Sequence, residues 1–157
     1  MSTAEPSKWT LPRLTVNPEG EWFHEGEEIT HPGILANLMR NLRRDETGYF
    51  IQAGPVRIPV EVADAPFVVV RVEAVGGTPR VTLNDGTQAT LDPTTLRLTA
   101  AGIPYCRIKG GQFEARFSRA AAYQLGSLIE YDEGTGAAIL RVGGMAHRLS
   151  REEEDHR

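Results

Sequence analysis

The stretch from Pro104 to Phe117 (PYCRIKGGQFEARF) restricts the folding of this chain more than any other. At its centre, Gly110-Gly111 accepts the positive φ angles that a two-residue hairpin loop requires. Folding about this dipeptide predicts three apolar pairs on one face: Ile108 with Phe113, Cys106 with Ala115, and Pro104 with Phe117. It predicts three polar pairs on the other face: Lys109 with Gln112, Arg107 with Glu114, and Tyr105 with Arg116. The pattern indicates a half-buried antiparallel hairpin, because a slip of one residue would bury arginines.

Two amphipathic helices are predicted in addition. In the first, Thr30 is the expected N-cap, Pro32 lies in the first turn, and the helix continues to Arg44. Its apolar residues fall within an arc of ~140°. Arginines lie opposite, where they either complement the helix dipole or recognise phosphate. The second helix is predicted to run from its cap Ser118 to about Ile129.

The remaining segments have the patterns of short strands. Residues 49–62 predict a hairpin that turns at Gly54-Pro55, and Asn84-Asp85-Gly86 predicts another turn within 81–91. Further strands are expected over 68–75, near Leu96 and Leu98, and over 129–149. Pro59 lacks a ladder donor, so its strand should lie at a sheet edge or carry a bulge. We expect any homodimer to form through that edge.

These elements predict an α+β fold of antiparallel hairpins and short sheets with two amphipathic helices. The expected organisation is a loose N-terminal arm (1–18), a first lobe (19–75), a second lobe (78–149) and a frayed charged tail (150–157), with the boundary at Gly76-Gly77. Tyr49 to Gly54 and Tyr105 to Gly110 share an offset of 56 residues, which indicates two similar lobes. That offset places opposite polarities on corresponding faces.

Composition excludes several functional classes. A chain of 157 residues with 40% hydrophobic and 24% charged residues can bury a core, and its net charge of −4 argues against a general nucleic-acid binder. No leader pattern or run of about 18 apolar residues is present, so we expect a soluble cytoplasmic protein without a membrane partner. No phosphate-binding glycine motif, zinc-ligand spacing or nucleophile elbow is found, and we expect no metal and no cofactor. Cys106 is expected to be a buried, inert thiol rather than a nucleophile.

The order of motifs resembles the uncharacterised bacterial family called domain of unknown function 1285. The resemblance extends from about Gly20 to Leu149. It rests on the following segments: GEWFHEGEEIT, LRRD, GYFI, RIPVEVADAPF, VTLNDG, LRL, IPYCRIKGGQFEARFSRAAAYQL and a final strand that contains Gly-Gly. The segments AGPVR and GGMAHRL depart from the family pattern. The resemblance implies an α+β architecture of repeated motifs and a role in signalling or regulation, with no established enzymatic activity.

One surface is predicted to bind a ligand. Tyr105, Arg107 and Arg116 project from the charged face of the central hairpin, which leads directly into the second helix. The N-terminus of that helix, with Arg119 and Tyr123, would complete a site for a phosphate or carboxylate. The alternative is purely structural: Arg107 pairs with Glu114, and Arg116 packs over Tyr105.

The functional prediction is therefore a non-catalytic regulatory or signalling module that binds a small anionic ligand or a protein partner between its lobes. Two alternatives remain open. One is a hydrolase that uses Asp64 and Glu114 as an acid–base pair, although Asp64 is more simply a turn residue. The other is a protein–protein scaffold.

Overall fold

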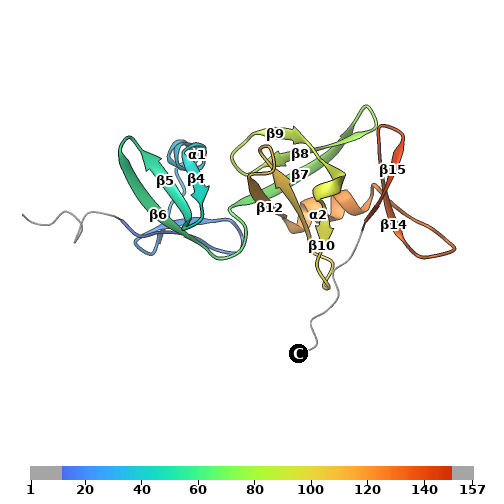
Figure 1. The fold of residues 1–157 in the computed structure, drawn as a ribbon, viewed down its shortest axis with the longest axis horizontal. Coiled ribbons are helices and arrows are strands. Elements are labelled where there is room, and N and C mark those ends of the chain that lie inside the picture. Colours follow the sequence, from blue (N-terminus) through green and yellow to red (C-terminus); the bar gives the residue numbers. More distant parts are fainter. Residues whose placement is uncertain (1–11, 150–157) are drawn as a thin grey trace, which may run out of the picture. The chain divides into compact units, whose positions relative to one another are not determined.

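Two compact units make up the structure, a computed structural model that describes residues 12–149. The chain divides after Asp64, so unit 1 ends there and unit 2 begins at Ala65. Each unit contains a six-stranded sheet of its own (Figure 1). The predicted α+β class with two similar lobes is confirmed.

In unit 1, the sheet has the strand order β3-β2-β1-β6-β5-β4. Its strands are β1 (Leu14–Val16), β2 (Trp22–His24), β3 (Glu27–Glu28), β4 (Leu42–Asp45), β5 (Gly48–Ala53) and β6 (Val56–Val62). Helix α1 (Pro32–Arg40) connects β3 to β4. The central pair, β1 and β6, is parallel, and every other neighbouring pair is antiparallel.

In unit 2, the sheet has the strand order β10-β11-β12-β7-β8-β9. Its strands are β7 (Phe67–Val75), β8 (Thr78–Leu83), β9 (Gln88–Thr90), β10 (Arg97–Leu98), β11 (Pro104–Ile108) and β12 (Phe113–Phe117), and the short 3₁₀ helix η2 (Pro93–Thr95) connects β9 to β10. Helix α2 (Arg119–Gly126) follows β12. A smaller antiparallel sheet closes the unit with β13 (Ile129–Tyr131), β14 (Ala138–Val142) and β15 (Met145–Leu149).

Both large sheets have the same connectivity. Three antiparallel strands are followed by a short helix and then by three more strands, and the first and last of the six pair in parallel at the centre. In this correspondence, β5 matches β11 and β6 matches β12, which are the strands that the 56-residue offset relates. The repeated topology therefore accounts for the similarity of Tyr49–Gly54 to Tyr105–Gly110.

The register predicted for the central hairpin is confirmed. Four cross-strand pairs join β11 and β12: Tyr105 with Arg116, Cys106 with Ala115, Arg107 with Glu114, and Ile108 with Phe113. The loop is four residues long rather than two, because Lys109, Gly110 and Gly111 all adopt positive φ, at 54°, 71° and 84°. The N–H of Gly111 donates to the carbonyl of Ile108, and that of Gln112 donates to Lys109, which makes two overlapping turns.

The core of unit 2 lies between this hairpin, β7 and α2. Phe67 and Phe113 are in edge-to-face contact, with ring centroids 5.4 Å apart. Ser118 caps α2 as predicted, because its hydroxyl accepts from the N–H of Ala121. The β7–β8 register shifts near Val69, and the Gln124 side chain accepts from the N–H of Val72 at 2.7 Å. This hydrogen bond connects α2 to β7 next to the register shift.

Both helices differ from their predicted limits. The N-cap of α1 is His31, not Thr30, since the His31 Nδ1 accepts from the N–H groups of Gly33 and Ile34. Helix α1 ends at Arg40 because Leu42 is buried as part of β4, opposite Ile51 of β5. Tertiary pairing thus overrides the helical periodicity of residues 42–44. Helix α2 ends at Gly126, and Ile129 begins β13.

The prediction that the strand of Pro59 lies at a sheet edge or carries a bulge is wrong for the strand as a whole. Strand β6 lies between β1 and β5, and Pro59 is in regular register with Phe50. The parallel ladder with β1 begins at Val60, so the missing N–H of Pro59 falls before that ladder starts. Among the described residues, 56–59 of β6 therefore pair with β5 alone, and a homodimer through this segment stays a prediction.

The predicted limits of the lobes also differ from those of the units. Gly76-Gly77 forms the turn between β7 and β8 and lies within unit 2, because β7 pairs with β12. The expected arm contains β1, whose Leu14 and Val16 are buried in the sheet of unit 1. Residues 1–11 of the arm and the tail 150–157 lie outside the described residues.

Candidate functional site

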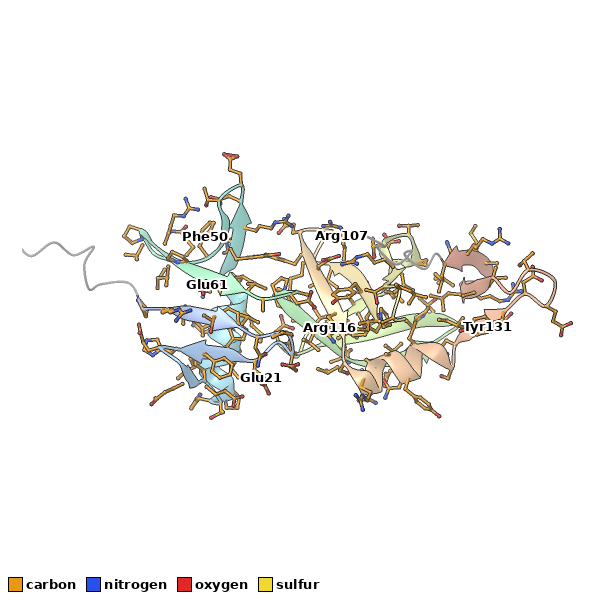
Figure 2. The ribbon with its side chains drawn as sticks, turned by 90° about the horizontal axis from the view of Figure 1, so that it is seen from below. Glu21, Phe50, Glu61, Arg107, Arg116 and Tyr131 are labelled. Atoms are coloured by element: carbon orange, nitrogen blue, oxygen red, sulfur yellow. The ribbon has the colours of Figure 1, made fainter. Side chains whose placement is uncertain are left out.

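The five residues predicted to bind a ligand occupy three different environments in unit 2. Arg107 is exposed near the turn of the hairpin, whereas Arg116 is half-buried farther along β12 (Figure 2). Tyr105 is buried. Arg119 and Tyr123 are exposed on α2, and the Tyr123 side chain has 82% of its surface in solvent. The geometry therefore does not present all five as one exposed cluster.

The polar face of the hairpin is organised by Arg97, which sequence reasoning did not single out. Its guanidinium lies 4.3 Å from the centre of the Tyr105 ring, and its Nε and Nη2 are each 2.9 Å from Oε2 of Glu114. Glu114 is thus held by Arg97 of the neighbouring strand β10, and not by Arg107 as the structural alternative supposed. Arg107 instead donates to the carbonyl of Gly111 at 3.2 Å.

A pocket of about 290 Å³ opens beside Arg107. It is lined by residues of β8, β9, η2 and β11, together with the turn at Gly110-Gly111. Because β9 and β11 are distant in the strand order, a shared pocket requires the sheet to curl so that its two ends face each other. Four of the lining residues form a buried apolar wall: Val81, Leu91, Cys106 and Ile108.

Polar groups at the rim of the pocket are connected through Thr95. The Thr95 hydroxyl accepts from the N–H of Arg107 at 3.1 Å and donates to the carbonyl of Asp92 at 2.8 Å. Asp92 caps η2 through Oδ1, which accepts from the N–H and the hydroxyl of Thr94. Those two hydrogen bonds, with a smaller effect of His147, hold the pKa of Asp92 below its ordinary value. Its carboxylate is therefore ionised at neutral pH.

Lys109, next to the glycines of the turn, also lines the pocket. Its ammonium lies 3.1 Å from Oδ2 of Asp85 and 5.2 Å from the centre of the Phe67 ring. Burial raises the pKa of Asp85, but hydrogen bonds from Thr87 and Lys109 outweigh burial and lower it overall. The positive charge of Lys109 is consequently balanced by a carboxylate within the fold.

The described residues provide neither an activated thiol nor a metal centre at the pocket. Burial, and to a lesser extent Glu114, raises the pKa of Cys106 to about 12, and the expected burial of this thiol is confirmed. Among residues 12–149, no group of three or more His, Cys, Asp or Glu side chains is placed to hold a metal ion. The two carboxylates of the hydrolase hypothesis belong to different units, Asp64 to unit 1 and Glu114 to unit 2.

Among the residues that line this pocket, the sequence predicted a ligand-binding role for Arg107 but none for Asp92, Thr95 or Lys109. Asp92-Pro93-Thr94 has the local signature of a capped turn, which would have predicted η2. No local signal places η2 beside β11, because that proximity depends on the curl of the whole sheet.

Comparison with known families assigns the chain to a family of unknown function. A family model named DUF2944 and described as "Protein of unknown function (DUF2946)" matches residues 5–142. The chain belongs to this family. No curated protein matches the chain. No helix among the described residues is long and apolar enough to cross a membrane.

Two solved structures resemble the chain, and both are of DUF1285 family proteins. The protein from Silicibacter pomeroyi DSS-3 is 25% identical with a TM-score of 0.74, over 93% of this chain and 86% of that one. The protein from Shewanella baltica OS155 is 22% identical with a TM-score of 0.62, over 74% of this chain and 91% of that one. The resemblance to domain of unknown function 1285 is therefore confirmed, and it extends to the fold.

Proposed function

We propose that this protein is a non-catalytic regulatory module that binds a small anionic ligand in the pocket of unit 2. The observation that supports this most directly is the position of Arg107 at the rim of an apolar cavity. Among the described residues, Arg107 donates to a backbone carbonyl and has no carboxylate partner. A guanidinium in this setting can bind a carboxylate or phosphate with two parallel hydrogen bonds.

The wall of the pocket limits the size and character of the ligand. Its volume of about 290 Å³ is just below the range for small-molecule sites, roughly 300–1,000 Å³. Buried apolar side chains line the interior, and the charged groups lie at the opening. This arrangement favours a ligand with an apolar body inside and an anionic group at the rim.

The pocket is a better site than the start of α2, which the sequence favoured. The hydroxyl of Ser118 already satisfies one N–H of the first turn, and neither Arg119 nor Tyr123 lines this pocket. The two sites can be distinguished experimentally, since Arg107 belongs to one and Arg119 to the other.

A thermal-shift screen of small carboxylates and phosphorylated metabolites tests the proposal, with calorimetry to follow hits. A ligand should raise the melting temperature, because binding to the native state stabilises it. Arg107→Gln should weaken binding by at least about tenfold, the loss of one charge-assisted contact. Arg119→Gln, the matched control, should leave the affinity unchanged.

The opposite ranking would contradict the assignment. If Arg119→Gln abolishes binding while Arg107→Gln does not, the ligand binds at the start of α2. If no anion in the screen binds, the proposed function is wrong. Turnover of an ester or phosphoester that disappears in Glu114→Gln would instead support the hydrolase.

A further inference from the structure

The rim of the pocket carries two opposite charges that are not paired with each other. Arg107 provides the positive charge and Asp92 the negative one, and both line the pocket. In the described part of the chain, no ion pair joins them. Thr95 holds the two segments together, because its hydroxyl is bonded to the backbone of both residues. The two charged residues therefore line one cavity, Asp92 at the N-cap of η2 and Arg107 on β11.

Among the described residues, neither charge is in an ion pair, and His147 acts on Asp92 only as a smaller electrostatic effect that lowers its pKa. The hydrogen bonds that cap η2 engage only Oδ1 of Asp92, so Oδ2 accepts none of the hydrogen bonds found among residues 12–149. The guanidinium of Arg107 bonds only a carbonyl, that of Gly111. Lys109, the other cation at the rim, is neutralised by Asp85. The charge pattern that a ligand meets is thus one guanidinium and one carboxylate beside an apolar wall.

We propose that the pocket recognises a zwitterion: an amino acid with a short apolar side chain. Its carboxylate pairs with Arg107, its ammonium pairs with Oδ2 of Asp92, and its side chain packs on Val81, Leu91 and Ile108. A dianionic phosphate fits this rim poorly, because Asp92 repels it. This inference rests on the proposed function and narrows its ligand from any small anion to an amino acid.

Three ligands that share one five-carbon chain separate the contributions of the two charges. Norleucine carries both charges, hexanoate lacks the ammonium, and pentylamine lacks the carboxylate. Titration calorimetry on the full chain should rank norleucine tightest, with each of the other two weaker by at least about tenfold. This ranking is measured on the unaltered protein, so it does not depend on whether a variant folds.

Two substitutions then test which residue contacts which charged group of the ligand. Asp92→Asn keeps an oxygen that can cap η2, so η2 should persist while norleucine binding weakens and hexanoate binding does not. Arg107→Gln should weaken both norleucine and hexanoate. Asp132→Asn is the matched control, because Asp132 caps its own turn through Gly134 and lies outside the pocket. It should leave all three affinities unchanged.

The outcomes separate this inference from the proposed function. If hexanoate binds as tightly as norleucine and Asp92→Asn changes neither affinity, the proposal of a zwitterionic ligand is wrong. The proposal of an anion-binding site is then retained. If none of the three ligands binds, the proposal of a zwitterionic ligand is again wrong. The proposed function is then tested by the anion screen alone. If norleucine binding is lost in Asp132→Asn but not in Asp92→Asn, the assignment of the ammonium contact is wrong.

Discussion

The ammonium of Lys109 lies 3.1 Å from the carboxylate of Asp85, and this contact connects two hairpin turns that are far apart in the sequence. Asp85 belongs to the turn between β8 and β9, and Lys109 to the turn between β11 and β12. Strand β7 lies between these two hairpins in the sheet, and the ring of its first residue, Phe67, also faces the ammonium. The ion pair thus fixes one wall of the pocket relative to another.

We expect Asp85→Asn to destabilise the protein by about 1–2 kcal/mol at neutral pH. Asparagine can still accept from Thr87, but it loses the charge pair with Lys109, in a position where the aspartate side chain is only 8% exposed. The free energy of unfolding, measured by urea denaturation, checks this expectation. A change below about 0.3 kcal/mol would show that the pair contributes nothing.

The same substitution should alter how stability depends on pH. The folded state lowers the pKa of Asp85, so its carboxylate stabilises the fold above the unfolded pKa of about 3.9. That contribution is lost as the pH falls through the lower, folded pKa. Asp85→Asn should therefore lose less stability than the wild type on acidification below about pH 4. Parallel pH profiles for the two proteins would contradict this assignment.

Removing Arg97 should destabilise the hairpin more than removing Arg107. Arg97→Ala uncovers the Tyr105 ring and removes the guanidinium that pairs with Glu114. Because the side chains of Arg97 and Glu114 are partly exposed, we expect the free energy of unfolding to fall by only about 1–2 kcal/mol. Arg107→Ala removes an exposed side chain and should change stability by less than about 0.5 kcal/mol. Equal effects in urea denaturation would mean that Arg97 does not organise this face.

The thiol of Cys106 should not react in the native protein. With a pKa of about 12, only about 10⁻⁴ of the thiol is ionised at pH 8, and the side chain is buried. Modification by a chromogenic disulfide should therefore be slow until denaturant is added, and should then reach one thiol per chain. Rapid modification without denaturant would show that β11 opens readily beside the pocket.

Hairpins were predictable because their signals are local. The alternation of residues 104–117 around paired glycines determines which side chains face each other, and the observed register follows it pair by pair. The parallel pairing of β1 with β6 has no such signal, because it joins a three-residue strand to a distant one. The same limit explains why Leu42 was assigned to a helix. Its apolar spacing fits α1, but its partner is Ile51.

The candidate site was predictable only in part, for a related reason. Arg107 could be assigned to the polar face from the hairpin alone, and it lies there. The burial of Tyr105 depends on Arg97, and the neighbourhood of Asp92 depends on where η2 packs. The burial of Tyr105 and the position of Asp92 both result from tertiary packing. Local sequence patterns therefore do not predict them.

The last prediction concerns the backbone of Lys109, whose φ of 54° is unusual for a residue with a side chain. A left-handed conformation costs a non-glycine residue about 1–2 kcal/mol, and the contacts with Asp85 and Phe67 offset it. Lys109→Ala keeps the backbone strain and loses those contacts, whereas Lys109→Gly loses the contacts and relieves the strain. The glycine variant should therefore be more stable than the alanine variant by about 1 kcal/mol in urea denaturation. An alanine variant as stable as the glycine one would show that this turn is not left-handed in solution.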